Sequence, residues 1–270
     1  MKKTLLLLLP FLLLLAGCAG LPPGETETTR DILELSVPVN LSEPAYSRYW
    51  DTWPSPEGIP LFLGVSRRLD DRGDEEDRAL DTAALSAAMY LQVEGLSRFY
   101  VENTSQGQGY SGDFQYRADE DLAGRLREEL EVVSRLQDHQ GTYLIVRYPG
   151  GSSLSLPGFG LPGGNPPEWT RTLPRLPGYL VSLGTAQRRQ YTVDSVTAAD
   201  LQALEEMVKT ISLQMSGQRN TLESNRGIGT VQSSLEVARA TVRGFYILAR
   251  WQSPDGSLFY SLGICPVNQN

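Results

Sequence analysis

The chain has 270 residues, of which 40% are hydrophobic, so it is long enough to bury a sizeable core in one large or two small domains. Its 32 acidic residues outnumber the 24 basic ones and give a formal net charge of −8, which excludes attraction to nucleic acid or anionic lipid through overall charge. Only two cysteines occur, and Cys265 lies in an apolar run that predicts a small buried side chain rather than a reactive thiol.

The first 17 residues have the pattern of a secretory signal. Lys2 and Lys3 provide a positive start, and an apolar run extends from Leu5 to Leu15. This run is shorter than the roughly 20 residues that a helix needs to cross the hydrocarbon core of a bilayer. We therefore predict a cleaved signal peptide over residues 1–17 rather than a permanent transmembrane anchor.

The end of this signal resembles the lipobox of bacterial lipoproteins. The residues that match are Leu15, Ala16, Gly17 and Cys18. The resemblance implies recognition of the first three by a signal peptidase, cleavage before Cys18, and attachment of lipid to that cysteine. It implies a membrane-anchored protein of the cell envelope, and Ala19 favours the outer over the inner membrane. The alternative is an ordinary signal peptide with a cysteine that occurs there by chance.

Two stretches of the mature chain are rich in glycine, proline and polar residues. Residues 18–45 are predicted to form a flexible tether from the lipid. Residues 150–177 are predicted to form a linker that holds neither a helix nor a central strand. The two linkers divide the chain into a first domain over 46–149 and a second over 178–270.

The two predicted domains show the same order of features. Each begins with a strand that ends in Leu-Gly, at Gly64 and at Gly184. An amphipathic helical pattern follows, carried by Leu80, Ala84, Ala87, Ala88 and Leu91 in the first domain and by Leu201, Leu204, Val208 and Ile211 in the second. After a polar strand, a second helical pattern is carried by Leu122, Leu126 and Leu130, and by Leu235, Ala238, Val242 and Phe245. Each domain closes with a hairpin signal, with turns at 138–141 and 254–256.

These features predict an α+β fold made of two tandem repeats. Each repeat is expected to run strand, helix, strand, helix, strand, strand, with a largely antiparallel sheet and the helices on one face. The alignment predicts that Gly64 superposes on Gly184 and Gly141 on Gly256.

Several short motifs in this order resemble the LPP20-type lipoprotein domain, which is also similar to the N-terminal domain of a flagellar assembly protein. The motifs are Trp53-Pro54, the strand end at 63–66, the alanine-rich helix at 79–88, and the segments 244–251 and 255–260 of the last hairpin. The resemblance covers most of the mature chain. It implies an envelope location and a small α+β domain, and it supplies no catalytic residues.

The sequence offers no recognisable reaction centre. His139, the only histidine, falls in a predicted hairpin turn and lacks partners at a catalytic or zinc-binding spacing. The acidic run at 70–77 does not have the spacing of a calcium loop and is better explained as the start of a helix. The glycines at 158–163 have the letters of a dinucleotide-binding fingerprint, but no strand precedes them. We therefore predict no catalytic residue, no metal site and no cofactor.

The favoured function is a non-enzymatic interaction or scaffold module that contacts another envelope protein or peptidoglycan. An envelope hydrolase is an alternative that requires two carboxylates in a cleft. A solute-binding lipoprotein is another, although it requires two parallel-sheet lobes, and the terminal hairpins argue against these.

Two polar segments, 103–114 and 217–229, are predicted to be long loops at equivalent places in the two repeats. Loops of this length are usually functional or disordered, and the sequence leaves both possibilities open. Aromatic residues and arginines are the usual anchors of interfaces. The candidate partner contacts are therefore Tyr110, Phe114, Arg219 and Arg226.

Overall fold

The computed structural model describes residues 50, 52–55, 57–104, 107–154, 156, 165–216, 222–223 and 232–267. All of them belong to one compact unit. The fold is α+β, with three α-helices and three antiparallel sheets in the described residues. Within the same residues, no helix is both long and apolar enough to cross a membrane.

The first sheet comes from the first half of the chain. Its strands are β1 (Leu61–Arg67), β5 (Gly141–Arg147) and β4 (Glu131–Gln137), in that order. Helix α1 (Arg72–Leu91) packs on this sheet through a row of buried alanines, Ala79, Ala83, Ala87 and Ala88. The short helix α2 (Glu120–Arg127) begins at Asp119, whose side chain accepts a hydrogen bond from the Leu122 amide as an N-cap does.

The second sheet comes from the second half of the chain and has the same strand order. Its strands are β6 (Tyr179–Gln187), β10 (Leu258–Pro266) and β9 (Tyr246–Gln252). Helix α3 (Thr192–Ser216) packs on it and buries Ala199, Ala203 and Leu204 completely. Between the halves, the chain forms a single 3-10 turn at Glu168–Thr170, which buries Trp169.

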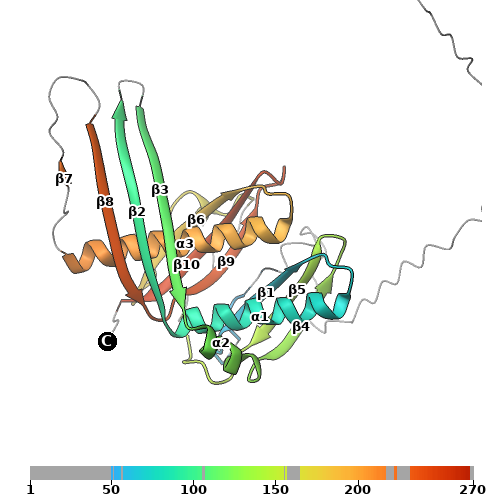
Figure 1. Ribbon diagram of the computed structural model, residues 1–270. Helices are drawn as coiled ribbons and strands as arrows, with labels where there is room; N and C mark the ends of the chain where they lie inside the picture. Colours follow the sequence, from blue (N-terminus) through green and yellow to red (C-terminus); the bar gives the residue numbers. More distant parts are fainter. Residues whose placement is uncertain are drawn as a thin grey trace, which may run out of the picture. The chain divides into compact units, whose positions relative to one another are not determined.

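The third sheet joins the two halves. Its order is β3 (Gly107–Ala118), β2 (Val93–Thr104), β8 (Gln232–Val242) and β7 (Leu222–Glu223). Strand β2 pairs with β3 over twelve residues and with β8 over eleven, so the first and second halves share a continuous hydrogen-bonded surface. Figure 1 shows β2, β3 and β8 as long neighbouring strands.

The core also connects the halves. Tyr246 of β9 packs edge-to-face against both Phe62 of β1 and Tyr90 of α1, with ring centroids 5.9 and 6.1 Å apart. The ring centroids of Trp50 and of Phe259 in β10 are 5.8 Å apart. The halves therefore bury their large aromatic side chains against each other.

Two of the expected elements differ from the structure. The segment of the second half that was expected to form its second helix instead forms strand β8. Along this strand Ala238, Ala240 and Val242 are buried while the residues between them are exposed, which is the two-residue period of a half-buried strand. The expected loop at 103–114 lies mostly in β2 and β3. The expected order of strand, helix, strand, helix, strand, strand is therefore wrong in its details: among the described residues, the first half has an additional strand and the second half has no second helix.

Two smaller predictions are confirmed. Cys265 is fully buried, and its thiol lies 3.1 Å from the Arg243 carbonyl oxygen. His139 is exposed in the connection between β4 and β5.

Candidate functional site: an open strand edge beside helix α3

The predicted site residues fall into two groups. Leu15, Ala16, Gly17, Cys18, Arg219 and Arg226 lie outside the described residues. Tyr110 and Phe114 both lie on β3, at even spacing and therefore on the same face of the strand. Phe114 is half-buried, and the side chain of Tyr110 is not described. The structure thus brings two of the four candidate contacts onto one strand of the third sheet.

Strand β3 forms an edge of the third sheet. It pairs with β2 along its whole length, and no second partner strand is found for it in the part of the chain that the structure describes. The side chains of Asp113, Gln115, Tyr116 and Arg117 are exposed, so both faces of this strand are accessible. An edge strand of this kind offers unpaired backbone N–H and C=O groups to another chain.

A hollow of about 410 Å³ lies between β3 and helix α3. Phe114 forms one wall, and the residues on the helix side include Asp194, Ala198, Leu201 and Gln202. Arg189, Thr197 and Glu205 complete the lining. Basic, acidic, amide and apolar groups are mixed here, so the hollow does not present charge of one sign to a ligand.

The third sheet is held on α3 by close contacts near the base of β2. Gly95 lies so near Val208 that a Cβ at this position would come within 2.3 Å of a valine methyl group. The buried Ser97 hydroxyl donates to the Glu205 carboxylate at 2.8 Å. Glu205 also pairs with Lys209, at 2.9 Å. Burial alone would lower the pKa of Lys209, but Glu206 and Glu205 outweigh it and raise the pKa above its ordinary value.

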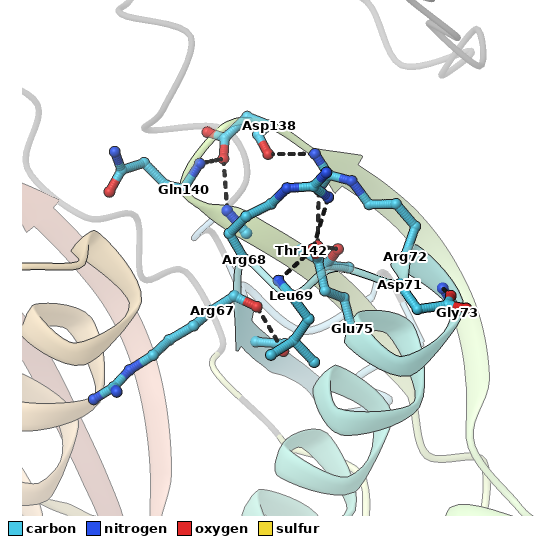
Figure 2. Close-up of polar contacts among 12 residues, drawn as sticks. Arg67, Arg68, Leu69, Asp71, Arg72, Gly73, Glu75, Asp138, Gln140 and Thr142 are labelled. Carbon is cyan, nitrogen blue, oxygen red and sulfur yellow. Dashed lines mark hydrogen bonds and ion pairs between the residues drawn. The ribbon is translucent and has the colours of Figure 1, made fainter.

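Two side-chain clusters are candidates for a catalytic site, and the first is a buried carboxylate at the start of α1 (Figure 2). Glu75 is completely buried. Its carboxylate accepts hydrogen bonds from Arg68 at 2.8 Å, the Leu69 amide at 2.7 Å, Arg72 at 2.7 Å and the Thr142 hydroxyl at 2.8 Å. Arg72 also donates to the carbonyl oxygen of Asp138, so the cluster joins α1 to the β4–β5 turn.

Burial raises the pKa of Glu75, but the hydrogen bonds from Leu69, Thr142, Arg68 and Arg72 together outweigh burial and leave the pKa below its ordinary value. Both carboxylate oxygens are occupied by protein donors. A general acid or base needs an accessible carboxyl group with a raised pKa, so this cluster is suited to holding the fold rather than to catalysis.

The second candidate is a partly buried ion pair between Asp200 of α3 and Arg250 of β9, at 2.8 Å. Only 6% of the Arg250 side chain is exposed, and its guanidinium also donates to the Trp50 carbonyl oxygen and to the Thr52 hydroxyl. Asp200 accepts a further bond from Ser261. The cavity beside this pair has a volume of about 40 Å³, which admits water but is far below the several hundred Å³ of a metabolite site.

The described residues contain no group of three or more His, Cys, Asp or Glu side chains that would hold a metal ion. Comparison with known proteins gives no match to any protein family, curated protein or solved structure.

Sequence reasoning missed both ion pairs and most of the β3 edge. Glu75 stands within a run of acidic residues, and the sequence does not show which member turns inward. For β3, the aromatic residues at every second position, Phe114 and Tyr116, were a usable signal of a strand, but the four glycines and serines around them favoured a loop.

Proposed function

We propose that the chain is a membrane-anchored envelope lipoprotein that acts as a non-enzymatic interaction module, with the exposed edge of β3 as its contact surface. The observation that carries the proposal is an unpaired strand edge with accessible side chains on both faces. The carboxylates of Glu75 and Asp200 both accept hydrogen bonds from protein donors, which supports a binding role over a catalytic one.

The anchor in this proposal is lipid on Cys18, after cleavage of residues 1–17. It is supported by the resemblance of Leu15 to Cys18 to a lipobox. Two acyl chains bury enough methylene groups for stable attachment, at about 0.8 kcal/mol for each group, so the body needs no membrane helix. The outer membrane is the proposed location because Ala19 follows the cysteine.

We further propose that the two halves are diverged copies of one LPP20-like unit. Gly64 faces Ala79 and Ala83 of α1, and at the same spacing Gly184 faces Ala199 and Ala203 of α3. Side chains in the first turns of α1 and α3 also accept equivalent hydrogen bonds. Glu75 accepts from the Leu69 amide, and at the same spacing Ser195 accepts from the Arg189 amide.

The irregularities of the two sheets support the same proposal. Gly64 pairs with Leu144 in the first sheet, and Gly184 pairs with Ser261 in the second. When these pairs are aligned, the two sheets have a bulge at the same position. It lies between Val132 and Ser134 in β4 and between Ile247 and Ala249 in β9. Because bulges are specific, conserved features of related sheets, a shared position favours common descent over coincidence.

One detail of the predicted alignment is wrong. The register places Gly141 opposite Arg67 and Leu258 opposite Gln187, so Gly141 corresponds to Leu258 and not to Gly256. The physical reason is that the β9–β10 turn is longer. The Asp138 amide donates to the Gly141 carbonyl in the first hairpin, whereas the Ser253 amide donates to the Leu258 carbonyl in the second.

Photo-crosslinking in intact bacterial envelopes tests the contact surface. Tyr116 on β3 is replaced by the photoreactive analogue p-benzoylphenylalanine, and Thr241 on β8 is replaced in a control variant. Both residues are exposed on strands of the third sheet. We expect a covalent protein adduct from position 116 and none from position 241. Equal labelling at both positions, or none at either, would refute the role of the β3 edge.

A further inference from the structure

We propose that the occupant of the β3 edge is β3 of a second copy of the same chain, paired antiparallel about a two-fold axis through Gln115. This inference rests on the proposed use of the β3 edge as the contact surface and names its partner. The two third sheets would then form one continuous sheet across the dimer, an isologous contact of the kind that closes after two subunits.

The sequence of the edge is complementary to itself in this register. The central residues are Asp113, Phe114, Gln115, Tyr116 and Arg117. When Gln115 faces Gln115 of the second copy, Asp113 faces Arg117, and Phe114 faces Tyr116. Each pair occurs twice because of the symmetry. Opposite charges and paired aromatic rings are the cross-strand neighbours that stabilise antiparallel strands.

The two kinds of pair fall on opposite faces of the strand. Asp113, Gln115 and Arg117 alternate with Phe114 and Tyr116. The rings of Phe114 and Tyr116 are already stacked in one chain, with centroids 6.3 Å apart and an interplanar angle of 22°. Tyr116 is 39% exposed, so it has apolar area left to bury against a second copy. The dimer would therefore form a row of four aromatic rings on one face and two ion pairs on the other.

The charged groups of this edge are available for such pairs. Within the described residues Arg117 takes part in no ion pair, and the one bond of Asp113 is the Gln115 amide that donates to its Oδ2 atom at 2.7 Å. The other oxygen of Asp113 can accept from an arginine. Gly112, which has no side chain, and Ala118, which has only a methyl group, flank the central residues and place no bulk in the way of a second strand.

Among the edge strands whose side chains the structure describes, β4 also carries exposed apolar side chains, but its geometry is unfavourable. Val132 and Val133 are 44% and 51% exposed, but the bulge of β4 falls at these residues. A bulge twists an edge away from regular pairing and is a usual protection against it. In contrast, the register of β3 against β2 has no interruption over twelve residues.

Charge exchange tests the register in the full chain, purified in detergent and examined by sedimentation velocity over a range of concentrations. We expect the unmodified chain to dimerise. Asp113→Arg places like charges opposite each other twice, so we expect the dimer dissociation constant to rise about tenfold or more. Arg117→Asp should act in the same way, and the double variant Asp113→Arg/Arg117→Asp should restore dimerisation because both pairs are reversed.

Disulfide trapping tests the two-fold axis. Gln115→Cys should form a disulfide-linked dimer under mild oxidation, because residue 115 faces itself. Arg117→Cys alone should form none, whereas a mixture of Arg117→Cys and Asp113→Cys chains should form one. The exposed Thr241→Cys variant controls for random collisions and for the native cysteines.

A monomer at all concentrations, or a dimer that is unaffected by either charge reversal and is not trapped at position 115, would overturn the inference. A monomeric chain that still gives an adduct with a different protein from position 116 in the envelope would overturn self-association alone and would support the proposed contact surface. A chain that dimerises as expected but gives no adduct at position 116 would overturn that surface's use in the cell.

Discussion

At the scale of single residues, the Glu75 cluster shows how one buried charge can fix three segments. Its carboxylate is bonded to the β1–α1 connection, to α1 and to β5. Removing the charge leaves Arg68 and Arg72 without their carboxylate. Because these two side chains remain partly exposed to water, the loss of stability is smaller than it would be for fully buried arginines.

We predict that Glu75→Gln lowers the free energy of unfolding by about 1–3 kcal/mol, because charge-assisted hydrogen bonds in the core are replaced by weaker ones or lost. Urea denaturation followed by circular dichroism measures this loss. Asp70→Asn is the matched control, since Asp70 is exposed, and it should change the free energy by less than about 0.5 kcal/mol. Equal effects of the two substitutions would show that the cluster contributes nothing specific.

The same residue gives a pH dependence. The pKa of Glu75 is lower in the folded protein than its ordinary value of 4.5. Its contribution to stability is therefore fully present above pH 4.5 and is lost as the pH falls through the folded pKa. The difference in unfolding free energy between the unmodified chain and Glu75→Gln should be constant near neutral pH and should shrink in acid below pH 4.5. A difference that grows on acidification would contradict this assignment.

At the scale of elements, the glycines of β1 and β6 set how closely the helices approach the sheets. A Cβ at Gly64 would lie 2.1 Å from the Ala79 carbonyl oxygen, and one at Gly184 would lie 1.9 Å from that of Ala199. Both contacts are with helix backbone, which cannot move without shifting the whole element. Gly124 in α2 has no atom within 4 Å of the same position.

We predict that Gly64→Ala and Gly184→Ala each lower the free energy of unfolding by about 2 kcal/mol or more, because the added methyl group overpacks the core. Gly124→Ala should instead raise it by up to about 1 kcal/mol, since alanine favours a helix. The melting temperatures of the three variants, measured by thermal unfolding, check this order of stability. Tolerance of alanine at either strand glycine would mean that its helix does not pack as closely as described.

The sequence predicted the main elements where the pattern was long and regular. Helices α1 and α3 and the two closing hairpins were expected from helical spacing and turn residues. Strands β1 and β6 were also expected, but they do not end at their Leu-Gly pairs and continue to Arg67 and Gln187. It failed in the third sheet for two reasons. In β8, the residues Leu235, Ala238 and Val242 fit helical spacing by chance, although alternation places Ala238, Ala240 and Val242 inside. In β2 and β3, the local sequence prefers a strand only weakly, and the two strands form because β2 pairs both with β3 and with β8 of the second half.

At the scale of the whole molecule, the two halves are bound together at several places. Strand β2 of the first half pairs with β8 of the second, Arg67 of β1 pairs with Asp194 of α3 at 2.7 Å, and Tyr246 lies against Phe62 and Tyr90. No local pattern in the sequence shows these contacts, because they join residues more than a hundred positions apart. Each half alone would expose the surfaces that the other one covers.

We therefore predict that the full chain unfolds in a single transition, although each half contributes a three-stranded sheet of its own. Tryptophan fluorescence and far-ultraviolet circular dichroism should report the same midpoint, and Gly64→Ala and Gly184→Ala should each shift both signals together. Two separate transitions, with one variant acting on each, would show that the halves are independent domains.

We propose that lipid on Cys18 holds this interaction module at the envelope. Intact-mass spectrometry of the protein extracted from bacterial membranes tests it most directly, with Cys18→Ser as the matched variant. We predict a mature chain that begins at residue 18 and carries the mass of a diacylglyceryl group with its acyl chains, and an unprocessed chain without lipid for Cys18→Ser. A lipid-free mature chain that begins at any other residue would contradict the account.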